Sequence, residues 1–119
     1  MPSERASLAL FDIRDHIRRA ENFISGLSEA EFVADEKTVY AVVRCLEIIS
    51  EAARRLPSDV RDRHPQLPWR AIMGAGNIYR HDYDNVSETF VWRTVRHDLA
   101  SLFEAVEREI AQLPPADAE

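Results

Sequence analysis

The sequence has little of three residue types that often carry chemistry in small proteins: cysteine, lysine and glycine. It contains one cysteine, three glycines and, among its 15 cationic residues, a single lysine, Lys37. One cysteine excludes an intrachain disulfide, which is typical of proteins in a reducing compartment. Cys45 also falls in the apolar phase of a predicted helix, so we interpret it as a core residue and not as a nucleophile.

Long apolar runs and an excess of positive charge are also absent. No run approaches the roughly 20 apolar residues that cross a membrane, and the first residues lack the apolar core of a signal peptide. We therefore expect a cytoplasmic protein in which residues 1–119 form one domain. The net charge of −6 does not support general affinity for nucleic acid, so any RNA chemistry would need a local basic pocket.

Hydrophobic residues recur at steps of three and four along most of the chain, which is the period of amphipathic helices. Pro57 ends one such pattern, and Pro68 can occupy the start of the helix that follows the connector and runs from Trp69. The spacing predicts helices over about residues 8–27, from 28, over about 35–56, 69–81 and 87–110. This pattern indicates an all-α, up-and-down bundle of four or five helices. Its apolar stripes could also supply a dimer seam.

The stretch GAGNIYRHDYDNV, residues 74–86, holds two of the three glycines. A glycine inside a helix costs about 1 kcal/mol relative to alanine, so Gly74 and Gly76 need an explanation. Close approach of another helix or a ligand, a break before the following loop, and tolerated drift all remain open. Arg70, Gly74, Asn77 and His81 share one face of the predicted helix, which is either the wall of a site or a solvated surface.

His81 has the residue chemistry best suited to a catalytic role. An imidazole with a pKa near its usual value of about 6.5 can take and return a proton at neutral pH. Arg80 and Arg70 could hold a phosphate. Arg80 and His81 converge only if the helix ends between them, which the following DYDN favours. Arg70 lies roughly 16 Å from His81 along one helix, so it could contribute only from a partner chain.

Two segments resemble the HepT-like proteins of the HEPN superfamily. LPWRAIMGAGNIYRHDYDNVSETFVWRTVRHDLASL is similar to the signature region of that family, and VVRCLEIISEAARRLP, with Glu51 and Ala52, is similar to its third helix. The resemblance implies a small helical bundle that dimerises, with a cleft between the protomers. It also implies a toxin that cleaves RNA as a metal-independent endoribonuclease without a cofactor, partnered by an MNT-type nucleotidyltransferase antitoxin.

The family signature consists of an arginine, four to six residues, a histidine, one further residue and a tyrosine. His81 and Tyr83 match its second half, and Asn77 matches the asparagine that follows the arginine. Gly76 stands where the arginine is expected. The resemblance implies a catalytic site at His81 and Asn77, and transfer of AMP to Tyr83 by the partner enzyme. The cation that the reaction needs would be Arg80, or Arg70 of a partner chain.

Several alternatives remain beside this interpretation. Without the motif arginine, the chain could be a non-catalytic interaction module that binds the nucleotidyltransferase. Tyr83 could instead pack at a helix end with its hydroxyl hydrogen-bonded, as we expect for Tyr79 in the core. His97 and Asp98 repeat the His-Asp pair at 81–82, but too few ligands accompany them, and we predict no metal site. We expect the remaining histidines at the surface; they are His16 and His64.

Overall fold

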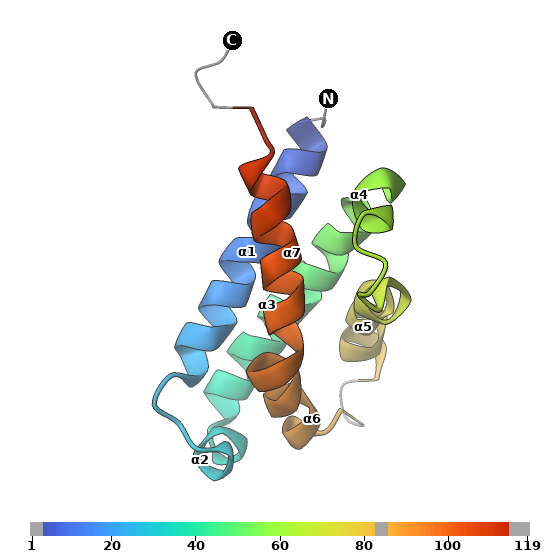
Figure 1. The fold of residues 1–119 in the computed structure, drawn as a ribbon. Coiled ribbons are helices and arrows are strands. Elements are labelled where there is room, and N and C mark those ends of the chain that lie inside the picture. Colours follow the sequence, from blue (N-terminus) through green and yellow to red (C-terminus); the bar gives the residue numbers. More distant parts are fainter. Residues whose placement is uncertain (1–3, 83–85, 115–119) are drawn as a thin grey trace.

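A computed structural model of the chain describes residues 4–82 and 86–114, and all regular elements in these ranges are helices (Figure 1). This confirms the all-α prediction. The first half contains α1 (Glu4–Ile24), α2 (Glu29–Ala34), α3 (Glu36–Arg55) and α4 (Ser58–Asp62). The second half contains α5 (Trp69–His81), α6 (Glu88–Arg93), the π-helical turn η2 (Thr94–Asp98) and α7 (Leu99–Ala111).

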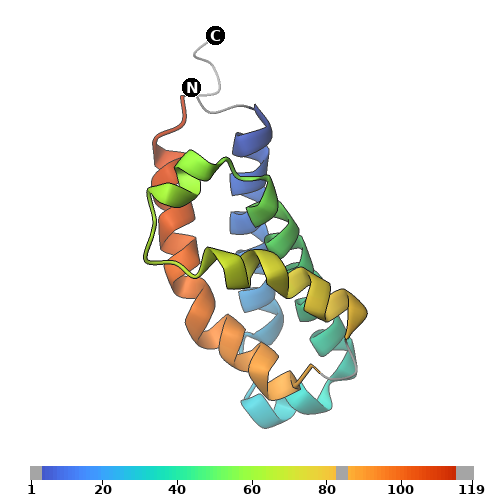
Figure 2. The same cartoon turned by 90° about the vertical axis from the view of Figure 1, so that its right-hand side faces the viewer.

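Three long helical rods form the bundle, and α5 lies obliquely across them. The rods are α1, α3 and the continuous run α6–η2–α7, and α1 packs against both of the others. Figure 2 shows α5 crossing the face that α3 and the C-terminal rod make, and its main contacts are with α3. No described helix is long and apolar enough to cross a membrane. The arrangement leaves one long side of α5 outside the bundle.

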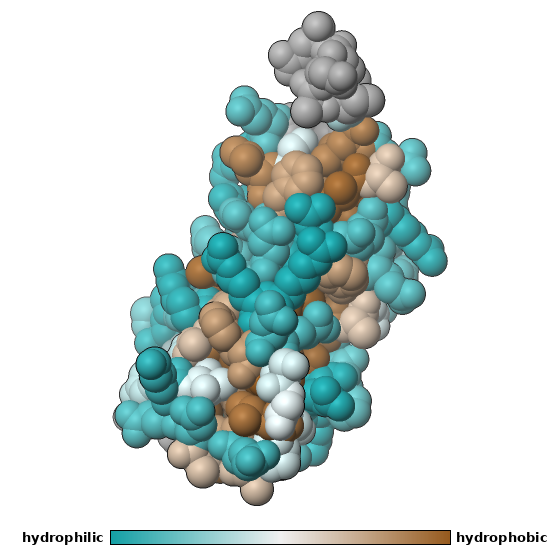
Figure 3. Space-filling view, turned by 90° about the vertical axis from the view of Figure 1, so that its left-hand side faces the viewer, coloured by the Kyte–Doolittle hydropathy of each residue, from teal (hydrophilic) through white to brown (hydrophobic). Residues whose placement is uncertain are grey.

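The core forms where the predicted apolar stripes of the three rods meet. Ile13 and Ile17 of α1, Val42 of α3, and Val91 and Leu102 of the C-terminal rod are all almost completely buried. On the outer side of α1, hydrophilic side chains predominate with smaller apolar areas between them (Figure 3). The helices are therefore amphipathic, with their apolar sides turned inward, as the three-and-four spacing predicts.

Local sequence signals fix several helix ends. Ser28 and Glu31 form a capping box at the start of α2, and Asp35 caps α3 by accepting a hydrogen bond from the backbone N–H of Thr38. Gly26 follows α1 with a φ of 81°, which suits glycine. Pro68 occupies the N-cap of α5, immediately before the helix, which begins at Trp69 as predicted.

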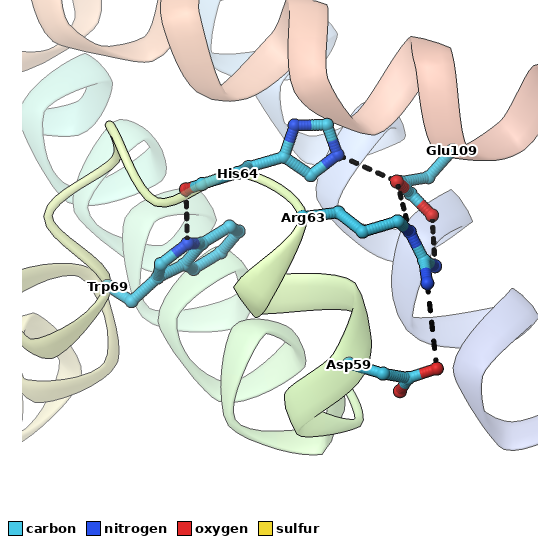
Figure 4. Close-up of polar contacts among 5 residues, drawn as sticks. All are labelled: Asp59, Arg63, His64, Trp69 and Glu109. Carbon is cyan, nitrogen blue, oxygen red and sulfur yellow. Dashed lines mark hydrogen bonds and ion pairs between the residues drawn. The ribbon is translucent and has the colours of Figure 1, made fainter.

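The connector between α4 and α5 is joined to α7 through a partly buried charged cluster (Figure 4). His64 places Nε2 2.7 Å from Glu109 Oε2. Arg63 donates one hydrogen bond to each oxygen of the same carboxylate. The Arg63 guanidinium is the main cause of a lowered Glu109 pKa. Trp69 donates its indole N–H to the His64 carbonyl at 2.9 Å. The cluster therefore fixes where α5 begins.

Our prediction that His64 is a surface residue is wrong, because only 8% of it is exposed. The reason lies in Glu109, which continues the apolar stripe of Leu102 and Val106 on α7. Because Glu109 lies on the buried side of α7, its carboxylate needs charged or hydrogen-bonding partners. Arg63 and His64 provide these partners. His16, half-buried, contacts the Asp12 carbonyl of its own helix.

The middle of α5 is held against α3 by a hydroxyl and a guanidinium. Ser50 Oγ donates to the Met73 carbonyl at 3.0 Å and accepts from the Gly76 backbone N–H at 2.9 Å. Arg54 Nε donates to the same Met73 carbonyl at 2.9 Å. A Cβ atom on Gly76 would lie 2.9 Å from Ser50 Oγ, whereas a Cβ on Gly74 would have no neighbour within 4 Å. Close helix approach thus explains Gly76 and not Gly74.

The two glycines therefore predict opposite effects of the same substitution. We expect Gly76→Ala to lower the free energy of unfolding by about 1–3 kcal/mol, because the new methyl displaces the Ser50 hydroxyl from both of its hydrogen bonds. Gly74→Ala is the matched control and should raise stability by up to about 1 kcal/mol, because alanine favours the helix and space is open. Urea unfolding followed by circular dichroism measures both. Unchanged or increased stability of the Gly76 variant would contradict the close packing.

Candidate functional site

The predicted site residues lie on the outer side of α5. Arg70, Asn77 and His81 are exposed and follow one stripe of the helix. His81 is the last helical residue, and the Asp82 N–H caps the end by donating to the Ile78 carbonyl at 2.9 Å. The structure thus brings Asn77 and His81 onto adjacent turns and leaves Arg70 at the other end of the helix. This agrees with our inference that Arg70 cannot reach His81 within one chain.

The expected helix end between Arg80 and His81 is absent, and that prediction was wrong. Both residues belong to α5, so their side chains leave the helix in directions about 100° apart. The helix can continue to His81 because the last carbonyl groups of α5 still accept hydrogen bonds, as the bond from the Asp82 N–H to the Ile78 carbonyl shows. A phosphate that meets both side chains must therefore lie between these two directions.

Arg80 carries its guanidinium back along α5 to the turn of Gly76. Its Nη2 donates to Asn77 Oδ1 at 2.8 Å, and its Nη1 lies 3.6 Å from the position that a Cβ of Gly76 would take. A helical side chain points toward the N-terminus and the residue four positions earlier, which explains this placement. A cation therefore reaches the turn of position 76, although the residue at that position has no side chain.

Position 76 itself cannot accommodate an arginine in this packing. Gly76 is buried against Ser50, and any side chain would begin by contacting the Ser50 hydroxyl at 2.9 Å. The departure from the signature is therefore coupled to the way α5 packs on α3. Asn77, exposed beside it, orients the guanidinium of Arg80 through the amide oxygen.

Sequence reasoning missed Ser50 and Arg54, the α3 residues that reach this turn. One signal was available, because Ser50 lies between Leu46 and Ala53 in the core phase of α3. A hydroxyl on the buried side of a helix needs a hydrogen-bond partner. A neighbouring helix that contains glycines can approach closely enough for its backbone groups to be that partner. Nothing in the spacing of Arg54 distinguishes it from an ordinary surface arginine.

Two further predictions concern tyrosines. Tyr83 lies outside the described residues. Tyr79 is 5% exposed, which confirms it as a core residue; burial raises its pKa to about 12, against a smaller lowering effect of its hydrogen bond with Thr94. It lines a cavity of about 360 Å³ between α3, α5 and the C-terminal rod, to which His97 and Asp98 also contribute. The described residues contain no group of three or more potential metal ligands.

Apolar surface lies beside the polar stripe. Ile78 is 57% exposed and Phe90 is 54% exposed. Together with Tyr79, Val86 and Ser87 they line a second, open cavity of about 340 Å³. Large apolar side chains this exposed and this close together mark a surface suited to contact with another macromolecule.

Comparisons with known proteins agree with the resemblance seen in the motifs. The family described as Ribonuclease HepT-like matches residues 13–109. A protein of Thermococcus cleftensis named probable ribonuclease HepT is 38% identical over 93 residues, which cover 78% of this chain and 84% of that protein. A protein of Methanocaldococcus jannaschii, provisionally named an RNase, is 30% identical over 117 residues, which cover 98% and 97%. No solved structure gives a significant match. The extent of these matches shows that the chain belongs to the HepT-like ribonuclease family.

Proposed function

We propose that this protein is the toxin of a HEPN/MNT toxin–antitoxin pair and cleaves RNA without a metal ion at a site around His81. The observation that carries the proposal is the guanidinium of Arg80, which lies over Gly76 and beside Asn77. It supplies a cation on the same helix that carries His81. The ribonuclease names of its relatives support RNA as the substrate class.

The reaction that these groups can support is an internal transfer at phosphorus. The ribose 2′-hydroxyl attacks the adjacent phosphorus while the His81 imidazole takes the hydroxyl proton. The bond from phosphorus to the 5′-oxygen breaks, the leaving oxygen gains a proton from water, and a 2′,3′-cyclic phosphate remains. Arg80 stabilises the charge on the non-bridging oxygens. No step requires a metal ion or an organic cofactor.

A homodimer would complete this site. Ile78, one turn before His81, and Phe90 at the start of the C-terminal rod offer exposed apolar area beside the polar stripe. Burial of these side chains against a second copy would exclude water from the end of α5. Arg70 is too far along its own helix to help His81, but a partner helix could bring its own Arg70 to the same phosphate.

Regulation by an MNT-type nucleotidyltransferase follows from the resemblance and concerns Tyr83. The Tyr83 oxygen would bond to the α-phosphorus of ATP as pyrophosphate leaves, and the hydroxyl proton passes to solvent. The added phosphate would carry negative charge two residues from His81. It would repel the phosphate of the RNA and compete for the same arginine.

A non-catalytic module that binds the nucleotidyltransferase is the second candidate. Two observations favour it: position 76 lacks the signature arginine, and α5 continues through Arg80 and His81, so their side chains diverge. In that case the exposed apolar residues would serve partner contact alone. The two candidates differ in one measurable property, which is RNA cleavage by the folded, unmodified protein.

The wild-type protein should cleave RNA in the presence of EDTA. His81→Ala should slow cleavage by about 100-fold or more, and Arg80→Ala by about 100- to 1,000-fold. Arg80→Lys should restore little, because an ammonium lacks the planar fork of a guanidinium. Arg5→Ala, an equal charge loss at the far end of α1, is the control. Gel analysis measures the rates; no cleavage by folded wild type would favour the interaction module.

A composite site makes a separate prediction about mixed dimers. His81→Ala and Arg70→Ala homodimers should each be weakly active, and co-expression should restore part of the activity, because one site in each mixed dimer then has both residues. Light scattering should give the mass of a dimer for every sample. Full activity of the Arg70 variant, or no recovery on mixing, would exclude Arg70 as a contributor from the partner chain.

Co-expression with an MNT-type nucleotidyltransferase should add the mass of one AMP to the chain and suppress RNA cleavage. Intact-mass spectrometry detects the addition, and Tyr83→Phe should abolish it because the acceptor oxygen is gone. Tyr79→Phe is the matched control, since that hydroxyl is buried. AMP addition that persists in the Tyr83 variant would assign the modification to another residue.

A further inference from the structure

Two arginines from different helices reach the same turn of α5. Arg54 of α3 donates from Nε to the Met73 carbonyl, one turn before Asn77, and Arg80 donates to the Asn77 side chain. Ser50 connects the two positions, because its hydroxyl contacts both the Met73 carbonyl and the Gly76 N–H. The turn from Met73 to Asn77 is therefore flanked by guanidinium groups.

Neither guanidinium is neutralised by a carboxylate within the described part of the chain. The contact of Arg54 is with a backbone carbonyl, and that of Arg80 is with an amide oxygen. The neighbouring Arg55 differs, because it forms an ion pair with Asp12 of α1 at 2.9 Å. Arg63 likewise pairs with Glu109. Arg54 and Arg80 are therefore held at one turn of α5 by neutral acceptors only.

The contact that fixes each arginine leaves most of its donors available. Arg54 uses Nε, so both Nη groups, with four N–H bonds, can meet another acceptor. Arg54 and Arg80 are both exposed, and Gly76 places no side chain between them. Each guanidinium matches the geometry of phosphate oxygens, and an anion shared by both would offset their mutual repulsion. Glu51, three residues before Arg54 on α3, is also exposed.

We propose that Arg54 is a second phosphate-binding residue, which joins Arg80 over Gly76 to hold the RNA phosphate that is cleaved beside His81. This inference rests on the proposed function, since it names a further residue for the same site. It assigns the third helix a direct role in binding substrate. The Met73 carbonyl orients the guanidinium of Arg54 as Asn77 orients that of Arg80.

Binding of a non-cleavable RNA tests the site without requiring catalysis. A fluorescent 2′-O-methyl oligonucleotide lacks the attacking hydroxyl, and its anisotropy reports affinity at several salt concentrations. Arg54→Ala should weaken binding by about 10- to 100-fold and lower the salt slope by about 0.7, as expected for one lost phosphate contact to a single strand. Arg44→Ala removes the same charge from an exposed position on α3 and should change affinity less than about twofold.

A double variant tests whether both arginines bind the same phosphate. The combined effect of Arg54→Ala and Arg80→Ala should be smaller than the product of the single effects, because residues that share one ligand are not independent. Arg54 also contacts Met73, so thermal unfolding must show that each variant is folded. If Arg54→Ala fails to fold, Arg54→Gln takes its place, since it keeps a donor near the Met73 carbonyl and removes the charge.

The possible outcomes separate this inference from the proposed nuclease activity. If the Arg54 variant binds RNA as the Arg44 variant does, the inference is overturned, even if the wild type cleaves RNA. If the wild type does not cleave, but Arg54 and Arg80 both contribute to oligonucleotide binding without additivity, the phosphate site stands and the nuclease proposal fails. Independent, multiplicative losses would assign the two arginines to different phosphates and overturn the shared site.

Discussion

The close contact between α3 and α5 at Gly76 is the constraint on which the site depends. A buried hydroxyl, that of Ser50, serves as acceptor for one backbone group of α5 and donor to another. Such a hydroxyl is stable inside a protein only if both partners stay within reach. A side chain at position 76 would separate them, so the contact determines how near α5 lies to α3 and which residues of α5 can face outward.

Because of this close contact, the cation near position 76 comes from a residue elsewhere in the sequence. Counting along the motif finds no cation at position 76. The helix nevertheless returns the side chain of residue i+4 toward that turn, and Arg80 lies four residues later. A motif defined by sequence spacing therefore underestimates what a helix can bring to one place. Because α3 packs closely against α5, Arg54 of α3 also reaches this part of the helix.

The sequence predicts the helices well because periodic burial and capping are local properties. The stripes containing Ile13, Val42 and Leu102 and the cap at Ser28 could all be read directly. Gly74 and Gly76 could not be told apart, because the difference is the presence of Ser50 from another helix near only one of them. His64 was misplaced for the same reason, since its burial depends on Glu109, 45 residues away. Contacts between distant segments decide which polar residues are structural.

The two anchors of α5 lie before the end that carries Arg80 and His81. Trp69 joins its start to the Glu109 cluster through His64, and Met73 joins its middle to α3. Arg80 and His81 follow both anchors and are exposed to solvent. In water, charge stabilisation by a single guanidinium is weak, and it grows only as the surroundings become less polar. The catalysis that we propose for these two side chains would therefore require something that covers them. The exposed Ile78 and Phe90 beside them are suited to hold that cover, and a second copy of the chain would supply it on both sides at once.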